Sequence, residues 1–116
     1  MEIPKPYKEN RPWGEELWLT KTSPSMVKIL TVNSGESCSL QYHHLRDEFW
    51  HVLSGNGTIE IGDKHIETKV GEEHFVPRET NHRFTGGTAP LVLLELTYGQ
   101  FDEKDIVRLE DKYGRT

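Results

Sequence analysis

The chain has 116 residues, of which 34% are hydrophobic, so we expect a single domain spanning 1–116 with a modest core. Its 14 Lys and Arg residues against 19 Asp and Glu residues give a net charge of −5, and nucleic acid is excluded as a partner because phosphate contacts need a concentrated basic surface. No apolar run approaches the about 18 residues of a membrane span and no apolar signal segment opens the chain, so we expect a cytoplasmic protein that does not bind membranes.

The chain begins with a Pro-rich segment, residues 1–12, that we expect to form an extended arm. From residue 13 to residue 98, short alternating or apolar segments are separated by Gly, Pro, Asn and Asp, a pattern typical of an all-β sandwich or barrel. Gly62-Asp63 predicts a two-residue hairpin between two of these segments. The predicted strands are 15–20, 27–32, 37–43, 48–53, 57–61, 64–69, 74–77, 82–85 and 91–98.

The C-terminal segment, residues 99–116, has a different pattern. We predict a short helical turn over residues 101–107, with Asp102 as its N-cap, followed by a solvated tail. Cys38 is the single cysteine, which excludes an internal disulfide, and its place in an alternating strand predicts a packing role.

Strand phase separates the polar residues of SLQYHHLRDEFWHVLSG, residues 39–55. Residues two apart share a face of a strand, so Gln41 and His43 point the same way. Glu48 begins the next predicted strand, and antiparallel pairing there would bring its carboxylate opposite His43. A fourth ligand has to come from a distant part of the sequence, and we select His82, which starts a predicted strand after VPRETN.

The sequence therefore predicts a metal site of Gln41, His43, Glu48 and His82. Two imidazole nitrogens and two oxygens suit one divalent ion, with zinc as the leading candidate and cobalt, manganese, nickel or iron as alternatives. The alternative is a barrel without metal, in which these buried groups are costly unless all are hydrogen-bonded. By default we assign structural or surface roles to the remaining histidines, His44, His51, His65 and His74.

Two motifs make the chain recognisable. The spacing from Gly35 through Gln41, His43 and Glu48 to Gly55 resembles the first cupin motif, with Gln in place of its first His. Gly71, Pro77 and His82 approximate the second motif, although Glu79 stands at its usual glycine and Gly86 where Asn is common.

The resemblance is closer to the cupin domain that ends the bifunctional type II phosphomannose isomerases/mannose-1-phosphate guanylyltransferases. It rests on three blocks in the same order: RPWG at 11–14, LQYHHLRDEFWHVLSG at 40–55 and DIVRLEDKYGR at 105–115. It implies a cupin-type double-stranded β-helix, or jelly-roll barrel, and a homodimer. No guanylyltransferase segment is present in the sequence, so nucleotide transfer is not expected.

The activity that the resemblance implies is isomerisation of mannose 6-phosphate and fructose 6-phosphate through an enediol, with the metal stabilising the developing charge. Arg46 matches an arginine that the family keeps for isomerisation, and we expect Glu79 to be the general base, with His44 and Glu95 as alternatives. For the phosphate of the sugar we predict Arg46, Arg83 and Arg11, with Arg115 as a further candidate, because guanidinium groups bind phosphate bidentately.

Two departures from the family concern activity: Leu45 and Phe49 stand where relatives commonly have histidines. If either histidine transfers protons in the relatives, this chain lacks it. A non-catalytic sugar-phosphate-binding cupin is therefore one alternative function. The other is a different metal-dependent cupin enzyme, such as a dioxygenase or an epimerase.

Overall fold

The computed structural model describes residues 7–22, 25–100 and 102–115, and every regular element among them is a β-strand. No helix with the length and apolar character needed to cross a membrane occurs in this part of the chain. The strands are β1 (Tyr7–Arg11), β2 (Gly14–Thr22), β3 (Ser25–Val32), β4 (Leu40–Tyr42), β5 (Arg46–Ser54), β6 (Gly57–Ile61), β7 (Lys64–Glu67), β8 (Glu73–Val76), β9 (His82–Gly86), β10 (Leu91–Gly99) and β11 (Val107–Glu110).

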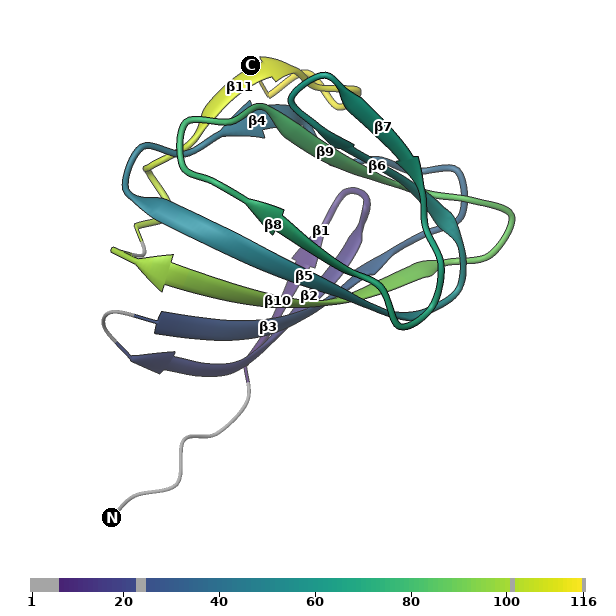
Figure 1. Cartoon of the computed structure of the whole chain (residues 1–116), viewed down its shortest axis with the longest axis horizontal. Coiled ribbons are helices and arrows are strands. Elements are labelled where there is room, and N and C mark those ends of the chain that lie inside the picture. The colour runs from purple at the N-terminus through teal and green to yellow at the C-terminus, as the bar shows by residue number, and fades with distance from the viewer. Residues whose placement is uncertain (1–6, 23–24, 101, 116) are drawn as a thin grey trace.

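The strands form two antiparallel sheets that face one another (Figure 1). The first sheet has the order β1-β2-β3-β10-β5-β8, and the second has the order β11-β4-β9-β6-β7. The predicted all-β, cupin-type architecture is thus confirmed. The Gly62-Asp63 hairpin is also confirmed, because Ile61 pairs with Lys64 across it.

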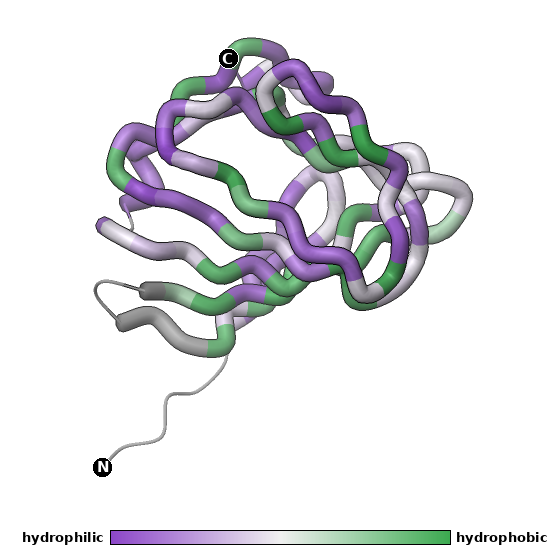
Figure 2. The backbone as a smooth tube through the Cα atoms, viewed as in Figure 1, coloured by the Kyte–Doolittle hydropathy of each residue, from purple (hydrophilic) through white to green (hydrophobic). Residues whose placement is uncertain are grey.

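Alternation of buried and less buried residues explains why these segments form strands. In β10, Leu91, Leu93, Glu95 and Thr97 are buried, and the residues between them are more exposed. Figure 2 shows hydrophilic and hydrophobic residues alternating along strands of both sheets. Each strand therefore presents one face to the interior of the sandwich.

The hydrophobic core lies between the two sheets. Trp50 of β5 is fully buried, and its ring meets the ring of Phe84 of β9 edge to face, with centroids 5.4 Å apart. Contact between these residues joins the sheets at the centre of the sandwich. The core residues are Trp13, Leu30, Val32, Cys38, Trp50, Val52, Ile59, Val76, Phe84, Leu91 and Leu93.

Two strands, β1 and β11, were not predicted from the sequence. β1 lies within the segment expected to be an extended arm, and it pairs with β2. β11 pairs with β4 where a solvated tail was expected. The sequence YKENR of β1 shows no apolar alternation, and VRLE of β11 alternates over only four residues, which is too short a pattern to separate a strand from the charged tail around it.

The predicted C-terminal helical turn is wrong for residues 102–107, whereas Phe101 lies outside the described residues. The Asp105 backbone N–H donates to the Asp102 carbonyl at 2.9 Å, and the Lys104 N–H donates to the Asp102 side chain at 2.9 Å. Asp102 thus closes a turn that leads into β11, because the hydrogen bonds of β11 go to β4 and cannot continue a helix.

Strand pairing also corrects the expected route by which Glu48 reaches His43. β4 pairs with β11 and β9, whereas β5 pairs with β10 and β8. Glu48 therefore approaches His43 across the interior, from the opposite sheet.

Candidate metal centre

Three predicted ligands converge between the sheets. His43 follows β4 and His82 begins β9, both in the second sheet, and Glu48 extends toward them from β5 of the first sheet. All three side chains are buried. The sandwich therefore brings together residues that are far apart in the sequence.

The donor atoms of these residues lie close enough to share one ion. His43 Nε2 lies 3.4 Å from Glu48 Oε2, and His82 Nε2 lies 3.6 Å from Glu48 Oε1. One donor atom from each residue lies within 4.8 Å of the other two. Metal–ligand bonds of about 2.0–2.2 Å can be reached from this spacing with small side-chain adjustments.

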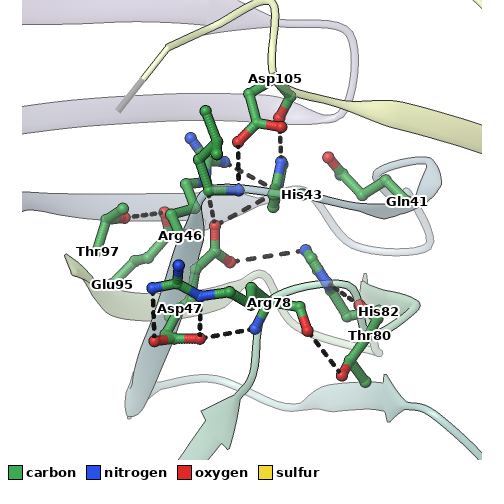
Figure 3. Close-up of polar contacts among 12 residues, drawn as sticks. Gln41, His43, Arg46, Asp47, Arg78, Thr80, His82, Glu95, Thr97 and Asp105 are labelled. Carbon is green, nitrogen blue, oxygen red and sulfur yellow. Dashed lines mark hydrogen bonds and ion pairs between the residues drawn. The ribbon is translucent and has the colours of Figure 1, made fainter. Parts of the chain in front are cut away.

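Backbone carbonyls fix the orientation of both imidazoles. His43 Nδ1 lies 2.6 Å from the Asp105 carbonyl oxygen, and His82 Nδ1 lies 2.9 Å from the Thr80 carbonyl oxygen (Figure 3). A carbonyl oxygen can only accept, so each Nδ1 carries the proton and each Nε2 keeps a lone pair. Both lone pairs are on the side of Glu48, as a metal ligand requires.

Burial and local charges give the three groups the protonation states of metal ligands. Burial lowers the pKa of His43 to about 4, an effect that Glu48 opposes and Arg46 reinforces. Burial also lowers the pKa of His82. Burial alone would raise the pKa of Glu48, but Arg46 and the two histidines outweigh it and lower the pKa to about 2. At neutral pH the site has two neutral imidazoles and one carboxylate.

Arg46 lies within this cluster. Its Nη2 atom is 2.9 Å from His43 Nε2, and its Nε atom is 3.0 Å from Glu48 Oε2. Arg46 is the first residue of β5, and its side chain is buried on the inward face. The guanidinium therefore competes with a metal ion for His43, and binding of the ion requires it to move aside.

The residues present fit a divalent ion. Glu48 Oε2 is buried, and apart from its 3.0 Å ion pair with Arg46 Nε it receives no hydrogen bond from the described residues. An ion would satisfy this oxygen and both imidazole lone pairs at once. Gln41, the fourth predicted ligand, pairs with His82 in the β4–β9 register, which places both side chains on one face.

A cavity of about 280 Å³ opens from the cluster. Gln41, His43, Glu48 and His82 all line it, and so does Arg46. Besides these and several apolar residues, its walls carry a second group of charged side chains: Arg11, Glu16, Lys28, Glu95, Glu103, Arg108 and Arg115.

Glu95 is the buried acid of this second group. Thr97 Oγ1 donates to its carboxylate at 3.2 Å, and β10 places Glu95 directly opposite Lys28 of β3. Burial and the negative charge of Glu48 raise the pKa of Glu95 to about 7. Glu95 can therefore hold a proton near neutral pH. In the sequence, its inward orientation is indicated by strand alternation, because Glu95 shares a face of β10 with Leu91 and Leu93.

Glu79, the predicted general base, does not line the cavity, and we correct that prediction. Its side chain is exposed, and its backbone adopts a φ of 62°. This is the left-handed conformation for which the cupin motif uses glycine. The Glu79 N–H donates to the His43 carbonyl at 2.6 Å, so the residue acts through its backbone and anchors the turn that carries His43.

Arg83, predicted to bind substrate, lies outside the cavity as well. Its Nε donates to the Cys38 carbonyl at 3.1 Å, and Nη1 lies 3.2 Å from the Glu110 carboxylate. Arg83 follows the inward-facing His82 by one residue, so strand alternation turns it away from the interior. Its guanidinium joins β9 to β11 instead.

Arg11 lines the cavity, as expected for a substrate-binding residue. Its Nε lies 3.2 Å from Glu16, and its Nη2 lies 3.4 Å from Glu103. Arg11 is therefore located where a ligand could reach it, but both carboxylates already compete for its charge.

Leu45 and Phe49, the two departures from the family, are not among the residues lining the cavity. The Leu45 side chain is exposed, and Phe49 contacts Phe75 and His51 on the outer side of β5. His44, an alternative base, is also exposed. The remaining histidines each lie near an acidic side chain away from the cluster: His51 near Glu73, His65 near Glu60 and His74 near Glu72.

Comparison with known proteins places this arrangement in context. The family described as Mannose-6-phosphate isomerase C-terminal matches residues 3–111. Xanthan biosynthesis protein XanB of Xanthomonas campestris is 39% identical over 108 residues, which cover 91% of this chain and 23% of that protein. A mannose-1-phosphate guanylyltransferase of Klebsiella pneumoniae is 35% identical over 107 residues, which cover 90% of this chain and 23% of that protein.

The fold is similar to that of a solved structure. The capsular polysaccharide assembling protein CapF of Staphylococcus aureus superposes with a TM-score of 0.77 at 23% identity, covering 92% of this chain and 33% of CapF. At this level of identity the likeness concerns the fold alone.

These comparisons correct the prediction of an isomerase of mannose 6-phosphate and fructose 6-phosphate. XanB is named for xanthan biosynthesis, and the name of the Klebsiella protein describes guanylyl transfer to mannose 1-phosphate. The chain also spans less than a quarter of the length of either relative. The isomerase prediction assigned to this segment an activity that those names do not give.

Proposed function

The chain belongs to the family described as Mannose-6-phosphate isomerase C-terminal, and from this membership we propose that it binds a divalent metal ion together with a phosphorylated hexose of mannose metabolism. The observation that carries the proposal is the cluster of His43, Glu48 and His82, whose imidazole lone pairs face one buried carboxylate. Its position in the wall of a polar cavity supports a small-molecule ligand.

Zinc is the ion that we propose first. Two imidazole nitrogens and a carboxylate oxygen form a three-residue set that zinc binds while keeping further positions open. The carboxamide oxygen of Gln41, on the same face as His82, is the proposed fourth protein ligand. When bound, the ion would supply Lewis acidity toward hydroxyl or carbonyl oxygens of the sugar.

The protein's own groups complete the proposed site. Arg46, which lines the cavity beside Glu48, brings a positive charge to the wall that an anionic ligand would contact. Glu95, with its pKa raised to about 7 by burial, can donate a hydrogen bond to a sugar oxygen near neutral pH. The charged cavity wall thus offers partners for both a phosphate and sugar hydroxyls.

Elemental analysis of purified protein tests the metal part of the proposal. We expect about one divalent ion per chain in the wild type and a loss in His82→Ala, because one ligand is removed. His51→Ala is the matched control, since His51 lies on the outer face of β5 near Glu73. Equal metal content in His82→Ala and His51→Ala would overturn the site.

Isothermal titration tests the ligand part. Mannose 1-phosphate should bind the zinc-loaded wild type and bind the EDTA-treated protein much more weakly. Equal affinity with and without zinc would contradict a role of the metal in ligand binding.

A further inference from the structure

The turn after β4, which carries His43, is held by Asp105, a residue 62 positions further along the chain. The Asp105 carbonyl oxygen lies 2.6 Å from His43 Nδ1 (Figure 3). The Asp105 carboxylate accepts the backbone N–H groups of the next two residues, His44 at 2.9 Å and Leu45 at 3.0 Å. One residue therefore holds both the imidazole and the backbone that carries it.

The carboxylate is the specific part of this contact, because every residue has a carbonyl. Each carboxylate oxygen of Asp105 accepts one of two consecutive N–H groups. Partial burial would raise the pKa of Asp105, but the N–H groups of His44 and Leu45 outweigh it and lower the pKa. The group is therefore an anion at neutral pH, and its hydrogen bonds are charge-assisted, which makes them about twice as strong as neutral ones.

Two further hydrogen bonds hold the same turn through its backbone. The Glu79 N–H donates to the His43 carbonyl at 2.6 Å, and the Gln100 N–H donates to the Leu45 carbonyl at 3.1 Å. Neither of these bonds reaches the imidazole. Among the described residues, Asp105 is thus the one that joins the backbone of this turn to the Nδ1 side of the His43 ring.

The other imidazole of the metal cluster is oriented locally. His82 Nδ1 lies 2.9 Å from the carbonyl oxygen of Thr80, which is only two residues earlier. The orientation of His43 depends instead on the pairing of β11 with β4, in which Val107 lies opposite Tyr42 and brings Asp105 to the turn. The two ligands should therefore respond differently to a change at Asp105.

We infer that Asp105 is the positioning residue of the metal centre. Its carboxylate holds the turn after β4, so that its carbonyl can fix the proton on Nδ1 and direct the Nε2 lone pair of His43 toward the ion. Partners of this kind set the tautomer and the ring orientation of metal-bound histidines. The inference rests on the proposed function in that the ion is the divalent metal proposed above. It gives the C-terminal block DIVRLEDKYGR, which contributes none of the proposed ligands, a role in metal binding.

The zinc affinity of Asp105→Ala, measured by competition with a chelator of known affinity, tests the inference. We expect a fall of about 10- to 100-fold, the usual cost of losing the partner of a metal-bound histidine. Asp105→Asn keeps an oxygen for one of the two N–H groups, so its affinity should lie between those of Asp105→Ala and the wild type.

Asp111→Ala is the matched control. It removes another carboxylate of the C-terminal segment that accepts a backbone N–H, that of Arg115 at 2.6 Å, away from the turn after β4. Its zinc affinity should match the wild type. Wild-type affinity of both Asp105 variants, or equal losses in Asp105→Ala and Asp111→Ala, would overturn the inference.

Nitrogen chemical shifts of the histidine rings in the metal-free proteins separate positioning of the ring from a general loss of stability. In the wild type we expect His43 and His82 to carry the proton on Nδ1. In Asp105→Ala the His43 signals alone should move toward a mixture of the two tautomers. Equal changes in both rings would mean that the substitution loosens the whole interior, and the positioning role would be wrong.

The same measurements distinguish this inference from the proposed function. If the wild type binds no zinc but Asp105→Ala still changes the His43 signals alone, the proposed metal binding is wrong and the positioning of the ring by Asp105 stands. If zinc binds equally well to the wild type, Asp105→Ala and Asp105→Asn, the proposed metal binding stands and the role of Asp105 is wrong.

Discussion

The inward face of β10 is apolar in its first half and polar in its second. Leu91 and Leu93 belong to the hydrophobic core, whereas Glu95 and Thr97 lie at the charged end of the interior. On β5, the antiparallel neighbour of β10, the order is reversed: Glu48 precedes Trp50 and Val52. The charged halves of neighbouring strands therefore lie together at one end of the sandwich.

The strand β3, on the other side of β10, shows the same division. Lys28 lies opposite Glu95, and Leu30 lies opposite Leu93. The apolar end gains free energy from burial, whereas the charged end buries carboxylates and amines at a cost. The apolar end therefore stabilises the fold, whereas the buried ionic network of the charged end is weak support for stability and fits the binding role that we propose for it.

The largest expected effect is at the apolar end. Leu93→Ala removes a fully buried side chain from the core and should lower the free energy of unfolding by about 2–5 kcal/mol. Urea denaturation at pH 7 measures the change. Zinc bound per folded chain should be unchanged, because Leu93 is not among the residues that line the cavity beside the metal cluster. A loss below about 1 kcal/mol would contradict the assignment of this end as the stabilising one.

Glu95→Gln, two residues further along β10, should act in the opposite direction. The folded protein raises the pKa of Glu95 from 4.5 to about 7, so the folded state holds a proton that the unfolded state releases. The contribution of Glu95 to the free energy of unfolding is therefore fully present below about pH 4.5 and is lost as the pH rises to about 7. The total loss is on the order of 3 kcal/mol. Glu95→Gln removes this loss and should be more stable than the wild type above pH 7.

Denaturation of both proteins at pH 4.5 and pH 8 measures the difference. The advantage of Glu95→Gln should be small at pH 4.5, where both folded proteins carry a neutral side chain, and largest at pH 8. An advantage of equal size at both pH values would show that the Glu95 charge is not its source.

The apolar core and the metal cluster could be predicted from the sequence far better than the second group of charged residues in the cavity wall. Nine strands follow from alternation, and the spacing of His43, Glu48 and His82 within recognisable motifs predicts their convergence. Alternation is absent from the edge strand β1, whose residues are mostly polar, and in the edge strand β11 it extends over four residues only.

The second group of charged residues was largely missed for a related reason. For Lys28 the sequence does indicate an inward orientation, since strand alternation places it on the same face as Met26 and Leu30 in SMVKILTV. Arg108 has no such signal, because its position depends on the unpredicted pairing of β11 with β4. Glu79 was selected for its chemical type, whereas its location depends on a backbone conformation that the sequence does not reveal.

The smallest effect tests whether the two ends open as one unit. Cys38 is buried in the hydrophobic core, and burial raises the pKa of its thiol to about 12, so iodoacetamide should react with it only when the core opens. If the ends unfold together, zinc at ten times its dissociation constant should slow the reaction by about 11-fold, or about 1.4 kcal/mol.

His82→Ala is the control for this measurement, because zinc should not slow its reaction if the ion acts through the metal cluster. Slowing in both proteins would mean that zinc blocks the thiol directly. Equal rates for the wild type with and without bound zinc would show that the core around Cys38 opens without disturbing the cluster. The division along β10 would then separate two units that unfold independently, and the charged end could be redesigned without changing the stability of the other.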